Sequence, residues 1–365
     1  MINVTQPSLA PLSEFIPYLE KIWASGIMTH NGPLLHELER ELATTFRVPD
    51  VICVANGTAA LQLALRALDI TGGEIITTPF TFIATANIIR WERCTPVFVD
   101  IDPETWNIDP ARIEAAITPQ TRAILPVHVF SAPCDVVSIK AIAEKHRLKV
   151  IYDAAHATAV DVDNQSLMTH GDVSCLSFHA TKLFNTCEGG ACVTGDPELA
   201  ARIRRMRFFG FNDNKEIVDD GMNAKMTEIA AALGLANLKY LTPVRANRRE
   251  KYSLYMKSLQ GNRHIRFQKF HPDAYNYSYM PVVFDSEETL LRVESHLKVN
   301  GVIPRRYFWP SLNTVLPLPQ DPPQPRQSLP VAEQIASRVL CLPLHDQLRD
   351  EEIQHISNLV LAKLS

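Results

Sequence analysis

One lysine stands in a polar turn between two apolar runs of the sequence. Residues 172–195 have the pattern of a strand, a turn that carries Lys182, a Gly-Gly pair and a second strand. A lysine held between buried strands loses hydration, which lowers the pKa of its amine and lets the amine form a Schiff base with a carbonyl. Ser177, five residues earlier, is placed to bind a phosphate. Together they indicate pyridoxal phosphate (PLP), although a lone lysine in a hairpin is more often simply exposed.

A second candidate phosphate contact lies near residue 56. Asn56–Ala59 stands between the apolar run Val51–Ala55 and a helical pattern. A helix N-terminus offers free backbone N–H groups and the positive end of the helix dipole, while Gly57 permits close backbone approach and Thr58 adds a hydroxyl. The segment predicts a phosphate-binding turn, with an ordinary helix cap as the alternative.

An aspartate and a histidine follow a third apolar run. Asp153 comes at the carboxyl end of a predicted strand, where open α/β sheets bind ligands, and His156 comes three residues later. A buried Asp153 can pair with a protonated pyridine nitrogen and keep the cofactor an electron sink. His156 can pack near the ring or hydrogen-bond to its phenolic oxygen. The alternatives are a helix cap for Asp153 and a core histidine for His156.

Two further motifs supply an aromatic ring and an amide. Within residues 78–85 we choose Phe82, ahead of Phe80, to stack on the pyridine face, although phenylalanines are usually core residues. Residues 221–228 open an alanine-rich helical pattern, and there Asn223 can donate its amide to a phosphate or cap the helix. Each motif has an ordinary structural explanation, but their occurrence together favours PLP.

The elements that must position these residues are those of an α/β protein. Short apolar runs alternate with helical patterns from about residue 50 to residue 240, which indicates a mostly parallel sheet with helices on both faces. The seven expected strands are Val51–Ala55, Glu74–Thr77, Val97–Val99, Ala123–Val127, Val150–Tyr152, Ser174–Phe178 and Ala191–Val193. The expected helices include Ala59–Leu68, Ile83–Trp91, Pro110–Ile117, Val136–His146 and Pro197–Phe208.

The pattern changes at about residue 241. The later segments are a charged helix, Pro243–Leu259, a strand, Tyr277–Phe284, a Pro-rich loop, Leu316–Pro330, and an amphipathic helix, Asp350–Leu364. We therefore expect two domains. Residues 1–240 form a large cofactor-binding α/β domain with an N-terminal arm, and residues 241–365 form a smaller α+β domain.

Composition restricts the class of protein. The 365 residues are 46% hydrophobic and 21% charged, as in an ordinary globular protein. A net charge of −4 and a pI near 6.3 do not favour nucleic acid or an anionic membrane as a partner. The seven cysteines are scattered and show no metal-ligand spacing. We expect a cytoplasmic protein with no signal peptide, no membrane span and no bound metal.

Taken in order, the motifs resemble those of the PLP-dependent sugar aminotransferases of the DegT/DnrJ/EryC1/StrS family, which have the type I, aspartate aminotransferase-like fold. The resemblance runs nearly end to end and includes Asn31–Pro33, Pro96–Asp102, Ile124–His128 and Leu340–His345. The chain departs from the family pattern at Ser131, where glycine is usual, and at Ala224-Lys225, where an aromatic residue and an arginine are usual. These departures affect local geometry and leave the chemistry in place.

The resemblance implies a role for each candidate residue. Lys182 forms the Schiff base with the cofactor and moves the proton, and Asp153 holds the pyridine nitrogen. His156 lies beside the ring, where many relatives have glutamine, and Phe82 stacks on it. The phosphate is held by Gly57, Thr58, Ala59 and Ser177. Asn223 reaches the phosphate of the neighbouring subunit, because the sites of this family lie at a dimer interface, and the resemblance thus predicts a homodimer with shared sites.

The resemblance also implies a reaction. The amino group of L-glutamate passes to a keto group of a nucleotide-linked sugar, with C-4 of dTDP-4-keto-6-deoxy-glucose as the expected acceptor, for the O-antigen of lipopolysaccharide. A C-3 keto-sugar or a UDP-linked sugar is the alternative acceptor. A PLP-dependent sugar dehydratase, which has histidine in place of the lysine, and a non-catalytic regulatory homologue are further alternatives. Residues 305–309 are expected to close over the sugar. The arginines of residues 202–207 are candidates for a diphosphate, although their helical spacing favours a solvated face.

Overall fold

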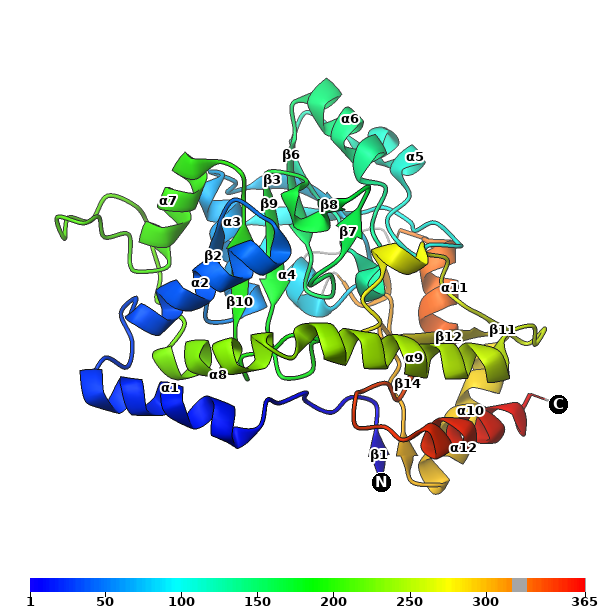
Figure 1. Ribbon diagram of the computed structural model, residues 1–365. Helices are drawn as coiled ribbons and strands as arrows, with labels where there is room; N and C mark the ends of the chain where they lie inside the picture. The colour runs from blue at the N-terminus through cyan, green and yellow to red at the C-terminus, as the bar shows by residue number, and fades with distance from the viewer. Residues whose placement is uncertain (317–326, 365) are drawn as a thin grey trace.

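The computed structural model describes residues 1–316 and 327–364. Its central strands are β2 (Val51–Val54), β3 (Gly73–Thr77), β4 (Cys94–Phe98), β5 (Thr121–Leu125), β6 (Lys149–Asp153), β9 (Val173–Ser177) and β10 (Gly190–Val193). They form one seven-stranded sheet in the order β2-β10-β9-β6-β5-β3-β4 (Figure 1). β10 is antiparallel to β2 and β9, and the other neighbouring pairs are parallel. The predicted mostly parallel sheet is confirmed, with each strand within three residues of its expected bounds.

Helices cover both faces of this sheet. One hydrophobic core contains residues of α2 (Pro33–Phe46), α6 (Val136–His146) and α8 (Glu228–Leu238). The other contains residues of α3 (Gly57–Ala67), α4 (Ile83–Trp91) and α7 (Pro197–Met206). Val51 and Cys53 of β2 belong to the first core, whereas Ile52 and Val54 belong to the second. Because successive side chains of a strand point to opposite faces, a strand buried on both sides is apolar throughout.

Most helices of the first half have nearly their expected bounds. α4 and α6 match, whereas α7 ends at Met206, two residues before the expected end. The expected helix Pro110–Ile117 is a short α5 (Pro110–Ile113) that continues as a 3-10 turn over Glu114–Ala116. A small hairpin of β7 (Asp161–Val162) and β8 (Gln165–Ser166) follows β6.

The second half is built around a three-stranded antiparallel sheet. Its strands are β11 (Ile265–Arg266), β12 (Met280–Phe284) and β14 (Val339–Leu342), and its helices are α9 (Leu241–Leu259), α10 (Glu287–Val299), α11 (Pro330–Arg338) and α12 (Asp350–Leu361). The N-terminal β1 (Ile2–Asn3) pairs in parallel with β13 (Val302–Ile303), so the first residues lie against this half. Most of the predicted Pro-rich loop, residues 317–326, lies outside the described residues.

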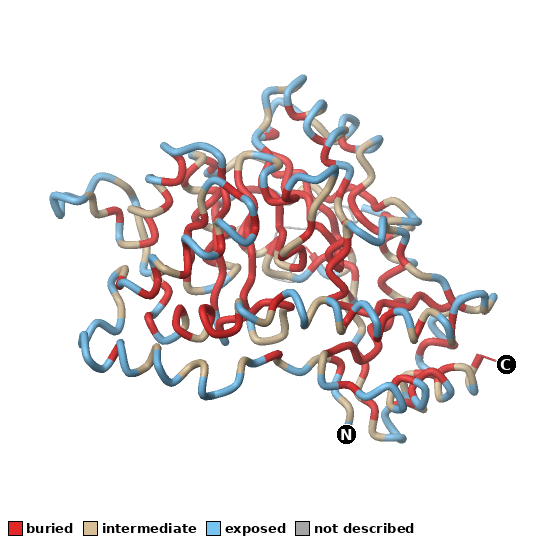
Figure 2. Tube along the Cα trace, in the orientation of Figure 1, coloured by how far each residue is buried: buried red, intermediate tan, exposed pale blue. Residues whose placement is uncertain are grey.

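The two halves share a hydrophobic core. Phe80 and Phe130 from the first half pack with Tyr279 and Phe308 from the second. Figure 2 shows the buried residues concentrated in the central sheet, while α1 (Leu12–Ser25) is largely exposed. Within the part of the chain that the structure describes, no helix is both long enough and apolar enough to cross a bilayer.

Candidate active site

The predicted site residues lie at or just after the carboxyl ends of four parallel strands. β2 ends just before Asn56, β6 ends at Asp153 and β9 ends at Ser177. β3 ends just before the segment that contains Phe82. The chain thus places the predicted phosphate, ring and lysine contacts at one edge of the sheet, which is where open α/β sheets bind ligands.

Lys182 lies in the turn between β9 and β10, half-buried beneath the second half of the chain. Its Nζ donates to the Tyr279 hydroxyl at 3.2 Å and lies 5.9 Å from the centre of that ring. Burial lowers the pKa of the Lys182 amine to about 8, against the opposing effect of the Asp153 and Tyr307 charges. About half of the amine is therefore neutral near pH 8, and the neutral amine can act as a nucleophile or base.

Asp153 is buried at the end of β6. Its carboxylate accepts hydrogen bonds from Thr85 Oγ1 at 2.7 Å and from the Ala155 amide at 3.1 Å. Burial raises its pKa, while these hydrogen bonds and the charge of Lys182 act in the opposite direction. Each oxygen accepts one bond and has a second lone pair free, so the carboxylate can still accept a pyridinium N–H. No helix begins here among the described residues, so Asp153 is not a helix cap.

His156 is buried in a cluster of aromatic rings. Its Nδ1 accepts from the Phe130 amide at 3.2 Å, and its ring is parallel to that of Phe308, with centres 5.6 Å apart. The Tyr279 ring lies 4.8 Å away. Burial, followed by the charge of Lys182, lowers the pKa of His156, so the imidazole is neutral at pH 7. With Nδ1 used as an acceptor, Nε2 carries the proton and can donate it to an oxygen in the site.

The predicted phosphate turn is formed by the start of α3 and the end of β9. A Cβ at Gly57 would lie 3.0 Å from Ser177 Cβ and 3.3 Å from the Leu176 carbonyl, so glycine allows this close approach. Asn56 caps α3 by accepting from the Ala59 amide at 2.8 Å, which occupies that amide. The amides of Gly57 and Thr58 come before the first intrahelical bond and remain directed to the end of the helix. The helix cap, one of the two alternatives from the sequence, is therefore observed, and it is compatible with the other, an anion-binding turn.

The two phenylalanines considered for ring stacking have different surroundings. Phe80 is buried, with its ring 6.1 Å from Phe130 and 5.8 Å from Phe308. Phe82 precedes α4 and is 59% exposed. Phe80 thus has the core position that is usual for phenylalanine, whereas the Phe82 ring is free to stack on a ligand.

Asn223 does not open a helix. The cap of α8 is Thr227, whose hydroxyl accepts from the Ala230 amide, and Asn223 instead pairs with Phe208 in an isolated bridge. Its side chain is exposed and accepts a hydrogen bond from Lys225 Nζ. Within the part of the chain that the structure describes, Asn223 therefore forms no hydrogen bond with the predicted site residues Lys182, Asp153 and Ser177.

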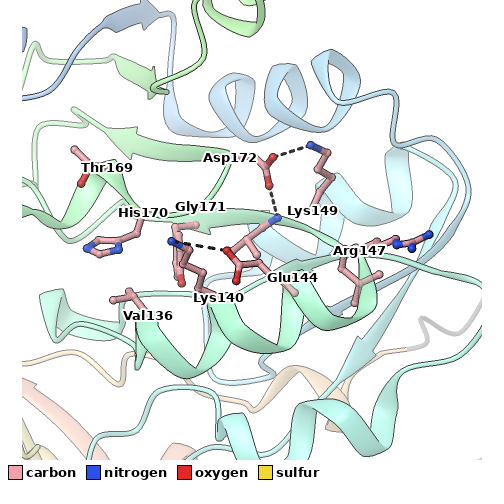
Figure 3. Close-up of a pocket in the computed structure, with 13 residues that line it drawn as sticks. Val136, Lys140, Glu144, Arg147, Lys149, Thr169, His170, Gly171 and Asp172 are labelled. Atoms are coloured by element: carbon pink, nitrogen blue, oxygen red, sulfur yellow. Dashed lines mark hydrogen bonds and ion pairs between the residues drawn. The ribbon is translucent and has the colours of Figure 1, made fainter.

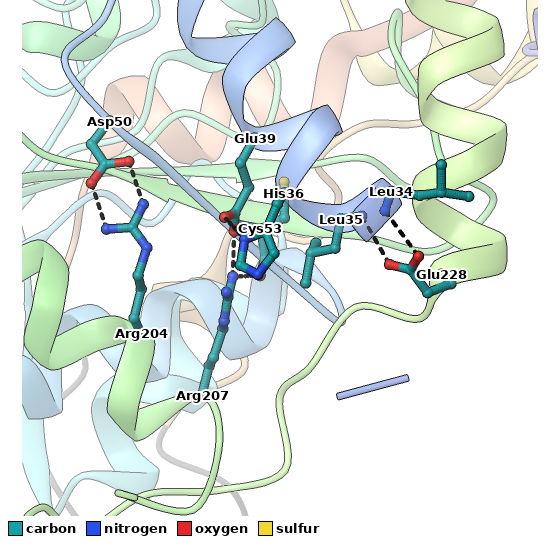
Figure 4. Close-up of polar contacts among 9 residues, drawn as sticks. All are labelled: Leu34, Leu35, His36, Glu39, Asp50, Cys53, Arg204, Arg207 and Glu228. Carbon is teal, nitrogen blue, oxygen red and sulfur yellow. Dashed lines mark hydrogen bonds and ion pairs between the residues drawn. The ribbon is translucent and has the colours of Figure 1, made fainter. Parts of the chain in front are cut away.

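The arginines of α7 and its C-cap, Arg207, form ion pairs with carboxylates of the same chain. Arg202 and Arg205 pair with Asp219, and Arg204 pairs with Asp50. Arg207 is buried and pairs with Glu39 (Figure 4). The candidate role of these arginines in binding a diphosphate is not supported by these contacts, and for Arg207 the expected solvated face is wrong.

The segment Arg305–Trp309 contributes one buried ring and several polar groups. Phe308 lies inside the aromatic cluster, while the Arg305 guanidinium donates to the Tyr307 hydroxyl at 2.9 Å. The rings of Tyr279 and Tyr307 are nearly perpendicular, with centres 5.9 Å apart. This segment of the second half therefore covers the Lys182 side of the site.

A cavity of about 500 Å³ lies elsewhere, between α6 and the start of β6 (Figure 3). Lys140, Lys149 and Asp172 line it, with an ion pair between Lys149 and Asp172. Because Lys149 begins β6 and Asp153 ends it, this cavity opens at the opposite end of the strand and is separate from the site.

Three residues at the site have no motif that reveals them in the sequence. Tyr279 and Phe308 come from the second half of the chain, and Tyr279 is 97 residues from Lys182. Thr85, which fixes Asp153, lies on α4 in the same segment as Phe82, but nothing in the sequence distinguishes it from a helix residue. In residues 1–316 and 327–364, no group of three or more His, Cys, Asp or Glu side chains could hold a metal ion.

The chain is similar to known proteins over nearly its whole length. The profile of the DegT/DnrJ/EryC1/StrS aminotransferase family matches residues 12–361. A Shigella dysenteriae protein named dTDP-4-amino-4,6-dideoxy-D-glucose transaminase is 44% identical, with 97% of each chain covered. The crystal structure of DesI in the presence of its TDP-sugar product has a TM-score of 0.93 at 36% identity, covering 100% of this chain and 93% of that one. The structure of NtdA from Bacillus subtilis with bound cofactor PMP has a TM-score of 0.88 at 29% identity, covering 97% and 82%.

Proposed function

The chain belongs to the DegT/DnrJ/EryC1/StrS aminotransferase family, and from this premise we propose that it transfers the amino group of L-glutamate to C-4 of dTDP-4-keto-6-deoxy-glucose. The observation that carries the proposal is the desolvated Lys182 amine at the carboxyl edge of the sheet, within electrostatic range of the buried Asp153. The name of the Shigella relative supports the nucleotide and the carbon, and the TDP-sugar product of DesI supports the nucleotide.

The residues at this edge fit PLP. A buried carboxylate with lone pairs to spare suits a pyridinium nitrogen, the close approach of Gly57 to Ser177 forms a turn for a phosphate, and the exposed Phe82 ring can stack on an aromatic face. When bound, PLP supplies a carbonyl for amines and an electron sink. In our proposal Asp153 and His156 orient the ring, and Gly57, Thr58 and Ser177 hold the phosphate, while the amide of Ala59 is used by the helix cap.

The chain itself supplies proton transfer and the exclusion of water. The neutral Lys182 amine would take the proton from the α-carbon of the amino acid and pass it to the cofactor within the same half-reaction. In the opposite half-reaction it would move a proton from the cofactor to the sugar carbon that gains the amino group. The aromatic cluster of Phe130, His156, Tyr279 and Phe308 shields this amine from bulk water on one side. A dry, fixed environment strengthens the electrostatic contacts on which these transfers depend.

We further propose a cytoplasmic homodimer that serves surface-polysaccharide (O-antigen) synthesis. Several large apolar side chains of the N-terminal helix α1 are exposed, including Leu12, Ile16 and Trp23. Burial of such a surface against a second copy, together with an Asn223 that has no hydrogen bond to Lys182, Asp153 or Ser177 among the described residues, supports sites shared between subunits. Mixing Lys182→Ala protein with Asn223→Ala protein tests this, because shared sites would restore part of the activity in mixed dimers.

The first experiment is the visible spectrum of the purified protein, before and after addition of L-glutamate. We expect a yellow band that bleaches with glutamate alone and returns with a keto-sugar. The keto-sugar is then varied: dTDP-4-keto-6-deoxy-glucose is expected to give a higher kcat/KM than a C-3 keto or UDP-linked sugar. A protein that stays colourless with added PLP would exclude the cofactor, and a yellow protein indifferent to glutamate would favour dehydration or a regulatory role.

The rate of the glutamate half-reaction is expected to depend on the pKa of Lys182. Below a pH of about 8 most of the free amine carries a proton and cannot accept another, so the rate is expected to rise with pH through that value. Stopped-flow bleaching of the yellow band between about pH 6 and pH 9.5 measures this limb. A flat profile over that range would contradict the role of Lys182 as the base.

Asp153→Asn is expected to lower kcat by about 10²-fold, because it replaces a preorganised charge with a neutral amide of the same shape. Asparagine can still accept from Thr85, so the fold is expected to be retained. The matched control is Asp172→Asn, at the opposite end of the neighbouring strand β9, which is expected to keep kcat unchanged. Equal losses in both variants would show a general effect on stability instead of a role at the ring.

A further inference from the structure

The hydroxyl group of Tyr279 forms a hydrogen bond with the Lys182 amine. The distance from Lys182 Nζ to the Tyr279 hydroxyl is 3.2 Å, and this is the hydrogen bond that the structure gives to the amine. Tyr279 begins the run into β12, so the contact joins the second half of the chain to the turn between β9 and β10. The amine therefore has a fixed position when it is not covalently bound.

The Tyr279 ring is held firmly by its neighbours. Its centre lies 5.4 Å from Phe130, 4.8 Å from His156 and 5.9 Å from Tyr307, and the residue is 6% exposed. Burial, followed by the charge of Cys341, raises the pKa of the phenol, against the opposing effect of Arg248. The hydroxyl thus remains protonated throughout the pH range in which Lys182 titrates.

We propose that Tyr279 is a positioning residue that holds the free Lys182 amine over the reacting carbon in both of its protonation states. This inference rests on the proposed function. A neutral hydroxyl can accept a hydrogen bond from an ammonium and donate one to an amine. A carboxylate in the same place could only accept, and it would favour the ammonium. The hydroxyl therefore keeps its contact while the amine takes up and releases a proton.

Several charged or titratable groups from different elements interact with the Lys182 amine. Asp153 comes from β6, His156 from the turn after β6, and Tyr307 from the second half of the chain. Asp153 and Tyr307 raise the pKa of Lys182, while burial lowers it to about 8. Tyr279 is the neighbour that forms a hydrogen bond with the amine, so its removal is expected to change both the position and the proton affinity of Lys182.

The test compares Tyr279→Phe with wild type in the holoenzyme. L-Glutamate first converts the cofactor to its amino form, which releases the Lys182 amine. Acylation of Lys182 by a water-soluble ester is then followed against pH by peptide mass spectrometry. Because the ammonium loses its hydrogen-bond acceptor, the midpoint of acylation is expected to fall by about one pH unit, a tenfold change in proton affinity. We also expect kcat to fall about 10-fold with KM for the sugar unchanged.

Two controls make the result specific. Tyr277→Phe removes a hydroxyl that donates to the Pro272 carbonyl, and it is expected to leave both midpoint and kcat as in wild type. Tyr279→Met, which fills space without a hydroxyl, replaces Tyr279→Phe if that variant folds poorly, and carries the same expectation. An unchanged midpoint and kcat in a folded Tyr279 variant would overturn the inference. Failure of wild type to bleach with glutamate would instead overturn the proposed function.

Discussion

Lys182→Ala is expected to lower the rate of amino transfer by about 10⁴-fold or more while the protein keeps its fold. One side chain provides both the amine that binds the cofactor and the base that moves the proton, so no other group of the site can replace it. The side chain is half-buried in a turn, and its hydrogen bond within the described residues is to Tyr279, so its loss removes little packing. Single-turnover bleaching with L-glutamate and thermal unfolding measure the two effects.

Rescue by a small amine distinguishes lost chemistry from lost structure. Methylamine added to the Lys182→Ala protein is expected to restore part of the half-reaction, since it can occupy the space of the missing side chain. Lys149→Ala is the matched control, because this lysine pairs with Asp172 at the amino end of β6, away from the site. Transfer at the wild-type rate in Lys182→Ala would contradict the assignment of the base.

The family and the mostly parallel sheet were predictable because the signals for both are local. Each central strand is buried on two faces, as β2 shows with Ile52 and Val54 on one side and Val51 and Cys53 on the other, and such strands are recognised as continuous apolar runs. The candidate lysine, aspartate and serine all lie at or just beyond strand ends. The type I fold and the aminotransferase family, inferred from these motifs in order, are confirmed by the comparisons.

The rest depends on contacts between distant parts of the chain. Glu228, at the start of α8, accepts from the amides of Leu34 and Leu35 and so caps α2, 194 residues away (Figure 4). A Cβ at Gly32 would lie 2.4 Å from the carboxyl carbon of Glu228, which gives a physical reason for glycine there. The contact between Tyr279 and Lys182 is of the same kind. No periodicity or motif records which distant side chain meets another, so neither could be predicted.

Breaking the buried ion pair between Glu39 and Arg207 is expected to cost more stability than breaking an exposed ion pair of the described residues. It joins α2 to α7 across the end of β2, because Glu39 also accepts from the Cys53 amide at 2.9 Å and Arg207 donates to the Cys53 carbonyl at 2.7 Å (Figure 4). The Arg207 side chain is 1% exposed. Glu39→Ala would leave this guanidinium buried without its carboxylate, so the free energy of unfolding is expected to fall by about 3–5 kcal/mol.

Urea unfolding measures this loss against two comparisons. Glu14→Ala removes an exposed carboxylate that pairs with Lys239 at 2.6 Å, and it is expected to cost about 0–1 kcal/mol. Replacing Glu39 and Arg207 together by leucine and methionine is expected to recover much of the loss, because no buried charge then remains unpaired. If Glu39→Ala costs no more than Glu14→Ala, the guanidinium has found water or another acceptor and the ion pair is not needed for stability.

The same carboxylate predicts how stability changes in acid. Burial acts to raise the pKa of Glu39, but the contact with His36 at 3.7 Å and the charge of Arg207 outweigh it and hold the pKa below its ordinary value of 4.5. The unfolded chain therefore binds a proton at a higher pH than the folded chain, so the stabilisation is complete above pH 4.5 and is lost as pH falls through the folded pKa. Glu39→Gln keeps the shape without the charge, and the difference in stability between it and wild type is expected to shrink as pH falls below that value. His36, whose pKa Glu39 raises, contributes below pH 6.5 and loses its contribution as pH rises through its folded pKa. His36→Gln is expected to remove this upper titration and to weaken the lower one, because the contact with His36 also helps to lower the pKa of Glu39.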